Sequence, residues 1–422
     1  MTNSISDGNR QTLILLTNHF PYGIHESFLA SEIPYLTASF SKVIIVARDV
    51  KSQGTRPTHG ATVYRIDPTS HWKEKCLTPW LFIKHARRIL GYVNDEVNWL
   101  RARNKKLTLR IWKQMFHTLT KALITAHHVN GIIERNHFSG KIALYSYWLS
   151  SSALATTFVA GNNISLKKIS RAHGGDVYEK RTNLGYLSFR RTLAKNLNSI
   201  YAISEHGAQH IRRQLSNNSS VKVARLGTEY GGKSPLKTSP TYVVVSCSFM
   251  VTVKRLNLLI SALQRIEKVD IHWIHIGNGP LEDSIKAIAK EKLGSKTNMT
   301  YTFKGALANT DIIEFYKNQY VDVFVNTSRS EGIPVTMMEA QSFGIPIVGP
   351  KTGGVPEVIT GGTGRLYDVH ATPEIIAGLI SEVLLLPEAD YNMMRQLAFQ
   401  NWHERYNAAN NFSTFVAEIS KL

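Results

Sequence analysis

Glu331 and Glu339 lie eight positions apart in the segment E-G-I-P-V-T-M-M-E-A. Residues 321–327 before them are β-branched and alternating, which predicts a strand. Glu331 then falls on the loop after that strand. Pro334 is expected as the first residue of a helix, because its missing N–H group would be unpaired there in any case. Glu339 lies more than one turn inside that helix. The spacing therefore predicts a loop acid and a helix acid at the carboxyl edge of a sheet.

The start of this helix places hydrogen-bond donors between the two acids. We expect the amides of Gly332, Ile333 and Val335 to be free of partners, and together with the helix dipole they favour an anion such as a phosphate. A carboxylate beside a phosphate is repelled, so Glu331 is expected to bind neutral sugar hydroxyls. Glu339 can accept two hydrogen bonds from the vicinal diol of a ribose. Spacing alone also fits two solvated surface acids.

The residues that follow favour the binding interpretation. Gly344 is expected to cap the helix, and residues 345–348 read as a buried strand. The strand leads into G-G-V-P-E at 353–357, a second glycine loop that allows close approach of backbone to a ligand. By itself, this loop fits an ordinary β–α turn equally well.

Taken together, these motifs resemble the donor-binding core of the retaining glycosyltransferases of family 4, a GT-B family. The resemblance is strong in the second half of the chain and weaker in the first. It implies an α/β fold of two doubly wound, Rossmann-like domains that face each other across a cleft. It also implies a nucleotide-diphosphate sugar as the donor, and it gives Glu331, Glu339 and Pro334 their places in the donor site.

The second half supplies further residues that match the family. Lys254 matches a family lysine that stabilises the departing diphosphate. Cys247-Ser248 stands where the family has Gly-Arg, so Arg255 is the candidate to replace the missing arginine. Gly277 and Gly279 belong to G-N-G-P-L, which resembles a nucleotide loop. Lys304 lies at the rim where the family holds the base, in a position that does not reveal which base it is.

The first half carries fewer matches. R-A-H-G-G-D resembles a family segment in which His173 contacts the donor sugar and Asp176 holds the turn. P-Y-G with Glu26 resembles the first glycine loop, so Tyr22 and Gly23 are expected near the diphosphate or the acceptor. A lone histidine is more often structural, and only one glycine of that loop remains.

The alternation of strands and helices argues independently for parallel, doubly wound sheets. We expect an acceptor domain at 1–230 with a basic helical insertion at about 71–128, and a linker at 231–240. A nucleotide-sugar domain is expected at 241–400. A C-terminal helix at 401–422 is expected to cross back to the first domain. The first helix is expected at 26–36.

Charge is divided unevenly between the two halves. The net charge is +19, but residues 1–240 hold 34 Lys and Arg against 13 Asp and Glu, whereas residues 241–422 hold 16 against 18. The insertion holds 12 basic and 3 acidic side chains, interleaved with Trp72, Trp80, Phe82, Trp99, Trp112 and Phe116. Basic and aromatic residues together favour an anionic membrane surface. Nucleic acid would also suit the charge, but no nucleic-acid motif is present, so no nucleic acid is expected as a partner. A solvated insertion without a partner stays open.

Composition limits the remaining classes. Cys76 and Cys247 are the only cysteines, so a disulfide scaffold is excluded and a reducing compartment fits. The polar N-terminus has no signal-peptide core, and no apolar run reaches the ~18–20 residues of a membrane span. We therefore expect a cytoplasmic protein that is peripheral at the inner face of the membrane.

The sequence thus predicts a retaining hexosyltransferase without a metal or other cofactor, since no Asp-x-Asp motif is present and Lys254 supplies charge. His173, Glu331 and Lys254 are the expected catalytic residues. The expected acceptor is a carbohydrate hydroxyl on a lipid-linked or growing surface polysaccharide. The alternatives are a GT-B epimerase or hydrolase, and a non-catalytic basic membrane-binding protein on the same scaffold.

Overall fold

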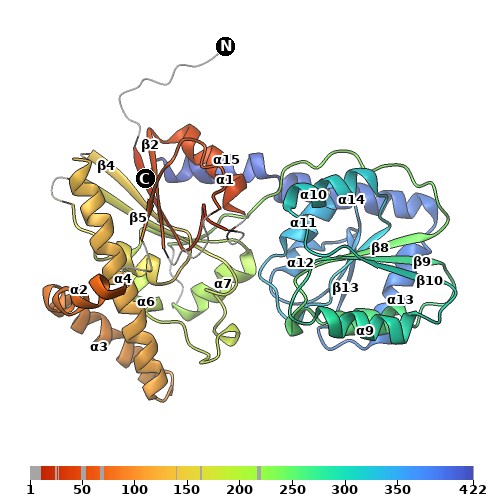
Figure 1. Ribbon diagram of the computed structural model, residues 1–422, viewed down its shortest axis with the longest axis horizontal. Helices are drawn as coiled ribbons and strands as arrows, with labels where there is room; N and C mark the ends of the chain where they lie inside the picture. The colour runs from red at the N-terminus through yellow and green to blue at the C-terminus, as the bar shows by residue number, and fades with distance from the viewer. Residues whose placement is uncertain are drawn as a thin grey trace, which may run out of the picture. The chain divides into compact units, whose positions relative to one another are not determined.

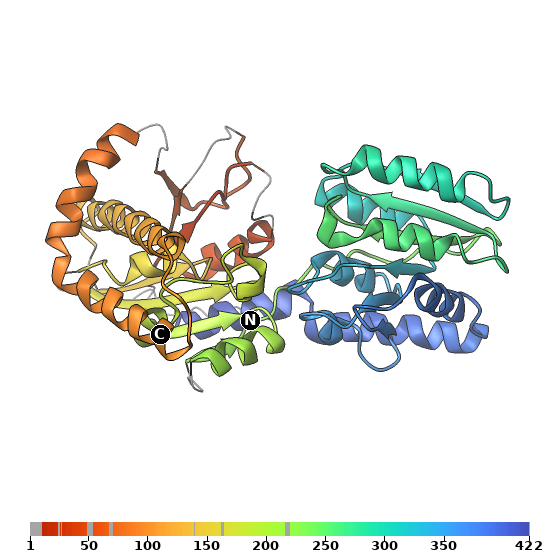
Figure 2. The same ribbon diagram turned by 90° about the horizontal axis from the view of Figure 1, so that it is seen from below.

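The structure, a computed structural model, describes residues 11–23, 26, 28–48, 54–66, 71–138, 140–161, 164–215 and 220–421, without the side chains of 71–75. The chain divides into two compact units. The N-terminal unit is Met1–Ala224 with Phe412–Leu422, and the C-terminal unit is Arg225–Asn411 (Figures 1 and 2). The segment 231–240, expected as a linker, has no helix or strand and belongs to the C-terminal unit.

The N-terminal unit is built on a seven-stranded sheet with the strand order β3-β2-β1-β4-β5-β6-β7. Every pair of neighbouring strands is parallel. The strands are β1 (Thr12–Thr17), β2 (Lys42–Ala47), β3 (Thr62–Arg65), β4 (Gly140–Ser146), β5 (Ile164–Ala172), β6 (Ser199–Ala202) and β7 (Val221–Val223). In a parallel sheet covered on both faces, strands are apolar throughout, as L-I-L-L in β1 illustrates.

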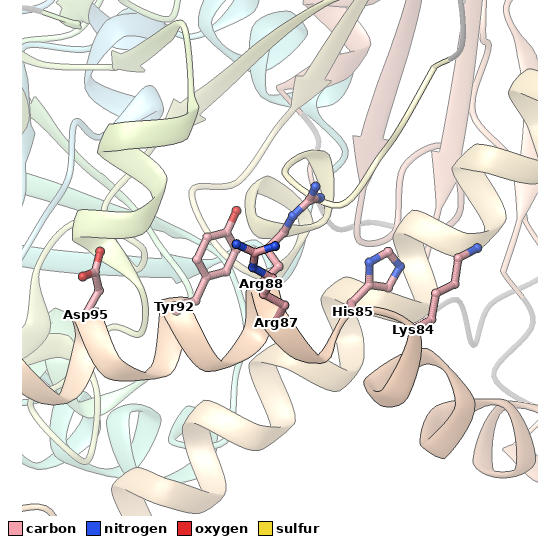
Figure 3. A pocket seen from close by; sticks show the side chains of 7 residues that line it. Lys84, His85, Arg87, Arg88, Tyr92 and Asp95 are labelled. Carbon is pink, nitrogen blue, oxygen red and sulfur yellow. The ribbon is translucent and has the colours of Figure 1, made fainter.

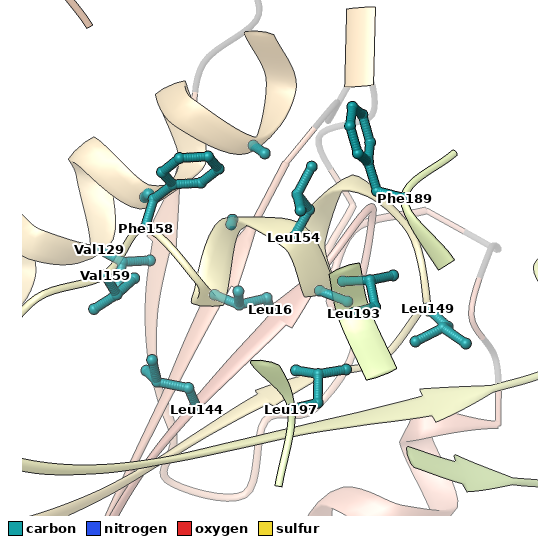
Figure 4. Packing of buried hydrophobic residues seen from close by; sticks show 14 of the residues in the cluster. Leu16, Val129, Leu144, Leu149, Leu154, Phe158, Val159, Phe189, Leu193 and Leu197 are labelled. Carbon is teal, nitrogen blue, oxygen red and sulfur yellow. The ribbon is translucent and has the colours of Figure 1, made fainter. Parts of the chain in front are cut away.

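Successive side chains of β1 serve the two faces in turn. Leu13 and Leu15 pack in a cluster with residues of α1 (Leu29–Ser39) and α15 (Ala408–Ile419). Ile14 and Leu16 pack in a second cluster, beneath the remaining helices (Figure 4). Those helices are α2 (His71–Lys84), α3 (Ala86–Ala102), α4 (Leu109–Arg135), α5 (Ser151–Thr156), α6 (Arg190–Asn196) and α7 (Glu205–Gln214). The insertion at 71–128 is therefore helical, and α4 also supplies core.

The predicted helix at 26–36 is wrong at both ends, since α1 spans Leu29–Ser39. Glu26 has a φ of 56°, a left-handed conformation that cannot continue into a right-handed helix. Its carboxylate instead accepts the amides of residues 18–20, and this contact replaces the helical start.

The C-terminal unit has a six-stranded parallel sheet with the order β10-β9-β8-β11-β12-β13. The strands are β8 (Tyr242–Cys247), β9 (Ile271–Ile276), β10 (Met299–Phe303), β11 (Val323–Val325), β12 (Ile347–Pro350) and β13 (Gly364–Tyr367). This is the Rossmann strand order. The strands all run parallel, but the order in which the chain adds them changes direction between β8 and β11, a point called the strand reversal below. In such sheets, ligands bind beyond the carboxyl ends of the two strands at the reversal.

Helices cover both faces of this sheet (Figure 1). α8 (Leu256–Leu263) packs against α9 (Glu282–Leu293) and α13 (Pro373–Leu384) on one face, and α11 (Val335–Ser342) packs against α14 (Glu388–Arg405) on the other, where α10 (Asn309–Asn318) also lies. The short helix α12 (Val355–Val358) follows β12.

The two ends of α11 differ in how well the sequence predicted them. Pro334 is the N-cap rather than the first helical residue, because its ψ of 116° is extended, and the helix begins at Val335. At the other end Gly344 takes a φ of 67° after the last helical turn, as expected for a C-terminal glycine. Strand β12 begins at Ile347, two residues later than predicted.

Within the parts of the chain that the structure describes, none of the helices has both the length and the apolar character needed to cross a bilayer.

Candidate active site

The loops after β8 and β11 bring Lys254 and Glu331 together at the strand reversal of the C-terminal unit. Lys254 Nζ lies 2.6 Å from Glu331 Oε1. Glu331 is 8% exposed, and the lysine side chain is partly exposed. Asn326 Nδ2 adds a longer contact of 3.5 Å to the same carboxylate oxygen. An acid and a base that are 77 residues apart in sequence therefore occupy the position where Rossmann-like sheets bind ligands.

The backbone that carries Lys254 is held by the neighbouring loop. Thr327 Oγ1 donates to the carbonyl oxygens of Lys254, at 2.8 Å, and of Arg255, at 3.1 Å. The lysine ends a 3-10 turn over Thr252–Lys254, and Arg255 then enters α8 with a φ of 50°. These contacts fix the base of the lysine side chain, while the ammonium reaches over to Glu331.

Arg255 is bound mainly to backbone. Its Nε donates to the Thr327 carbonyl at 2.8 Å and its Nη1 to the Val369 carbonyl at 2.7 Å. Burial lowers the pKa of this guanidinium, although its charge is retained at neutral pH. Nη2 is buried without a hydrogen-bond partner among the described atoms. If Arg255 replaces the missing family arginine, Nη2 is the guanidinium nitrogen left to bind a ligand. That role stays a prediction.

The two glycine loops that the sequence singled out lie against each other. Gly354 donates its amide to the Gly332 carbonyl at 2.6 Å. Gly353 has a φ of 54°, and a Cβ there would lie 1.8 Å from the Glu331 carbonyl oxygen. Only glycine allows this approach. The G-G-V-P-E loop thus packs against the Glu331 loop through backbone atoms rather than through a side chain.

The start of α11 presents donors next to this pair. Among the described residues, the amides of Gly332, Ile333 and Val335 donate to no backbone or side-chain acceptor. Orphan amides at a helix start favour an anion, and Lys254 adds a positive charge beside them. A ligand that bears a phosphate satisfies both.

Glu339 lies inside α11 and is buried, with 3% of its surface exposed. Its Oε1 accepts a hydrogen bond from Asn309 Nδ2 at 2.5 Å, whereas Oε2 has no partner among the described atoms. Burial raises the pKa of Glu339 to about 7, and the bond from Asn309 opposes this shift. A buried carboxylate oxygen without a donor is costly, so a ligand hydroxyl that reaches it gains a strong partner.

Gly277 and Gly279 have close neighbours of a different kind from those expected. A Cβ at Gly277 would lie 2.0 Å from the Ser248 carbonyl oxygen, and one at Gly279 would lie 2.6 Å from the Met250 carbonyl oxygen. Met250 in turn accepts and donates hydrogen bonds with the same loop. The glycines thus fit the loop after β9 against the loop after β8. Their predicted approach to a nucleotide stays a prediction.

Lys304 is exposed, with its ammonium 5.5 Å from the centre of the Phe315 ring. No described contact joins it to Lys254, Glu331 or Glu339. Its backbone amide donates to the His275 carbonyl and so continues the pairing of β9 with β10. Its predicted role in binding the nucleotide base stays a prediction.

In the N-terminal unit, His173 follows β5 and is 6% exposed. Its ring lies 4.5 Å from that of Trp148 and 4.7 Å from that of Tyr147, with Phe28 at 6.3 Å. Neither ring nitrogen has a hydrogen-bond partner among the described atoms, and Nδ1 is 3.9 Å from Asp176. The imidazole is therefore held by aromatic packing, and both of its nitrogens are buried without a hydrogen-bond partner among the described atoms.

Asp176 holds the loops around that histidine. Its Oδ1 accepts the His173 amide at 2.7 Å and its Oδ2 accepts the Leu149 amide at 2.8 Å. The pKa of Asp176 lies below its ordinary value: burial acts to raise it, but the nearby His173 side chain, the charge of Arg190 and the bond from the Leu149 amide outweigh burial. Arg190 donates to the backbone carbonyls of Leu149 and Asp176, so the carboxylate and the guanidinium together join the loops after β4 and β5.

Tyr22 and Gly23 belong to a loop that is closed by its own backbone. Gly23 donates to the Gly54 carbonyl at 3.0 Å, and Tyr22 bridges to Thr55. Glu26, which the sequence marked as part of this motif and as a helix start, accepts hydrogen bonds from the amides of residues 18, 19 and 20 and from the indole N–H of Trp148. The Glu26 carboxylate thus fixes the backbone of this loop. No described contact joins Tyr22 or Gly23 to His173.

Two residues of the C-terminal site escaped the sequence interpretation. Asn326 contacts Glu331 and also accepts the Ser328 amide, and Asn309 is the one described donor to Glu339. Asn326 directly follows a strand at the reversal, which is a positional signal that could have found it. Asn309 opens a helix 30 residues before its partner, and no local pattern marks it.

The part of the chain that the structure describes holds no cluster of three or more His, Cys, Asp or Glu side chains suited to a metal ion.

Comparison with known proteins supports one family. Residues 232–400 match the family described as glycosyl transferases group 1, which covers most of the C-terminal unit. A sulfoquinovosyl transferase of Arabidopsis thaliana is 34% identical over 27% of this chain and 21% of its own length. A GDP-mannose-dependent alpha-(1-6)-phosphatidylinositol monomannoside mannosyltransferase of Mycolicibacterium smegmatis is 28% identical over 44% of this chain and 49% of its own length. The alignments thus span half or less of these curated relatives.

Solved structures match both units. The sucrose-phosphate synthase of Thermosynechococcus elongatus superposes with a TM-score of 0.69 at 14% identity, covering 98% of this chain and 99% of that protein. The lipopolysaccharide outer core galactosyltransferase WaaB gives 0.67 at 14% identity, over 98% and 100%. HepE of Anabaena, in complex with UDP and glucose, gives 0.64 at 15% identity, over 97% and 100%. At these identities the likeness establishes the fold, which is the two-domain GT-B fold of glycosyltransferases.

Proposed function

We propose that this chain is a retaining glycosyltransferase that moves a sugar from a nucleotide-diphosphate sugar to a hydroxyl acceptor. The observation that carries the proposal is the Lys254–Glu331 pair, 2.6 Å apart at the strand reversal, beside the unpaired amides at the start of α11. The group 1 match over 232–400 supports the same assignment, because it contains both residues.

The donor is bound by three kinds of group. Lys254 and the amides of Gly332, Ile333 and Val335 receive the diphosphate, Glu331 accepts sugar hydroxyls, and Glu339 accepts the ribose diol. The pairing of Lys254 with Glu331 fits this division, since a phosphate can draw the ammonium away and leave Glu331 for a hydroxyl. Arg255, Gly277, Gly279, Lys304 and Pro334 are proposed to complete the donor site.

The charge that develops on the leaving diphosphate is stabilised by Lys254 and the helix start in this proposal. The acceptor hydroxyl attacks the face from which the diphosphate departs, so the anomeric configuration is retained and no covalent carboxylate is needed. His173 of the N-terminal unit orients the reacting sugar through a ring nitrogen, and Asp176 positions that histidine. The reaction is proposed to need no metal, because cationic side chains and amides do this electrostatic work.

We assign the acceptor to a lipid-linked or growing surface polysaccharide. Two observations support a lipid: the M. smegmatis relative is named for a phosphatidylinositol mannoside acceptor, and the insertion is basic and exposes Trp112 and Phe116 on α4. Trp72 of the same insertion has a side chain outside the described atoms. The enzyme is proposed to act in the cytoplasm at the inner membrane face.

The experiment is a turnover assay with a panel of UDP- and GDP-sugars, with and without lipid-linked acceptor, in the presence of a chelator. The expected result is acceptor-dependent release of a nucleoside diphosphate with a retained anomeric configuration. Release without acceptor would identify a hydrolase instead, and conversion of the donor sugar without release would identify an epimerase. A chelator that abolishes turnover would remove the claim of metal independence.

A further inference from the structure

A basic pocket lies where α3 begins in the N-terminal unit, apart from the strand ends that carry His173. Its volume is about 620 Å³, and it is lined by Lys84, His85, Arg87, Arg88, Gly91, Tyr92 and Asp95. Figure 3 shows the labelled side chains rising from the same side of the helix, with the arginines between Tyr92 and His85. We call it the α3 pocket.

Aromatic packing holds this pocket in shape. The rings of His85 and Tyr92 meet the Phe158 ring edge-on, at 5.4 and 5.5 Å. Arg88 lies 5.8 Å from the same ring, and its Nη1 donates to the Thr157 carbonyl at 2.8 Å. The guanidinium is therefore held in one orientation before any ligand arrives, which lowers the entropy lost on binding.

Positive charge in the pocket is not balanced by nearby acids. Asp95 is the one acid among the lining residues, and it is ion-paired with Lys195 at 2.5 Å. Burial and the charge of Arg88 lower the pKa of Lys168, and burial, Arg88 and Lys84 lower the pKa of His85. Cations thus crowd this region, and a bound anion would relieve their repulsion.

Exposed apolar side chains flank the same cations. Ile83 is 76% exposed at the end of α2, and Leu90 is 68% exposed on α3. Lys84 Nζ lies 4.9 Å from the ring of Trp80, which is itself 49% exposed. A free anion gains nothing from these side chains, whereas at a bilayer they would enter the interface beside the headgroups.

We propose that the α3 pocket binds the phosphate of an anionic phospholipid headgroup, with Arg87, Arg88 and Lys84 around the phosphate and with Ile83 and Leu90 in the interfacial layer. An arginine can bind two phosphate oxygens at once, which distinguishes a fitted site from diffuse attraction. This inference deepens the proposed location at the inner membrane face and rests on it, but it does not depend on whether the chain transfers a sugar.

The test compares two variants of equal charge. Lys84→Gln with Arg87→Gln removes two pocket cations that have no described hydrogen bond to the fold, and Arg101→Gln with Lys106→Gln removes two exposed cations elsewhere on the insertion. The full chain is sedimented with vesicles of phosphatidylcholine alone or with phosphatidylglycerol. We expect the pocket variant to lose at least tenfold more affinity for the anionic vesicles than the control variant. Equal losses would mean diffuse attraction and would overturn the site.

Further arms identify the ligand. Ile83→Ser should weaken vesicle binding severalfold without changing the melting temperature, and no loss would contradict interfacial insertion. Inorganic phosphate or a short oligonucleotide that binds as tightly as the anionic vesicles, with the same loss in the pocket variant, would overturn the choice of lipid. Donor turnover measured in detergent should be equal in both variants, so failure of the lipid site and failure of the proposed transfer are separable.

Discussion

Acids near the carboxyl ends of strands are used differently in the two units. In the N-terminal unit, Glu26 and Asp176 accept hydrogen bonds from five backbone amides, three by Glu26 and two by Asp176. In the C-terminal unit, the described partners of Glu331 and Glu339 are the side chains of Lys254, Asn326 and Asn309. A carboxylate that holds backbone amides fixes a loop, whereas one that contacts mobile side chains can exchange them for a ligand. The comparison separates acids that build a site from acids that bind in it.

The strongest test of the binding side of this comparison is Lys254→Ala. It should lower the rate of sugar transfer on the order of a hundredfold or more, because it removes a charge from the leaving diphosphate. The measurement is kcat/KM with the preferred donor, alongside Lys290→Ala on the exposed face of α9 as the control. Normal turnover in Lys254→Ala would end its assigned role.

On the structural side, Asp176→Ala should destabilise the N-terminal unit by about 3 kcal/mol, because two buried amides lose their acceptor at roughly 1–3 kcal/mol each, with partial compensation by water. Urea unfolding gives the free energy. Glu331→Gln should change stability by about 1 kcal/mol, because the amide oxygen can still accept a hydrogen bond from the partly exposed Lys254. If the two variants lose equal stability, the distinction between the two kinds of acid disappears.

Glu339 should make nucleotide affinity depend on pH. Its pKa is about 7 in the free chain, so at pH 6 about a tenth of the molecules carry the ionised form that accepts a diol. Affinity for a nucleoside diphosphate should therefore fall roughly tenfold from pH 8 to pH 6, as seen by calorimetry. Glu339→Gln should bind more weakly at pH 8 and should vary less with pH.

The same group predicts a smaller effect on stability. A carboxyl whose folded pKa is raised contributes stability that is present below its unfolded pKa, near 4.5, and lost as pH rises through about 7. Glu339→Gln removes the ionised group, so it should melt above the wild-type chain at pH 8 and near it at pH 5. A lower melting temperature at pH 8 would contradict the unpaired state of this carboxylate.

The sequence predicted more of the C-terminal unit than of the N-terminal one, for physical reasons that particular residues show. Glu331 and Glu339 could be placed because a strand, a loop and a helix follow one another within a short segment. Lys254 came from a family match, and its pairing with Glu331 needed the strand order. Pro334 was placed one position too far into the helix because extended and helical ψ values are both open to proline.

Long-range contacts explain what was missed. Glu26 was predicted as the first residue of a helix, but it lies before α1 and binds the loop at 18–20 through its carboxylate. Asn309 faces Glu339 only once α10 and α11 lie on the same side of the sheet. Gly277 and Gly279 carry the family pattern, yet their close neighbours are the loop at 248–250. Pattern and family can single out residues in such cases, but the contact that each makes is set by packing.

Thermal unfolding of the chain with a panel of nucleoside diphosphates tests the central claim most directly. A ligand that binds only the native state raises the melting temperature. We predict that one nucleoside diphosphate raises it for the wild-type chain and for Lys290→Ala but not for Lys254→Ala. If no nucleoside diphosphate stabilises the wild-type chain, or if Lys254→Ala is stabilised equally, the strand reversal of the C-terminal unit is not a donor site.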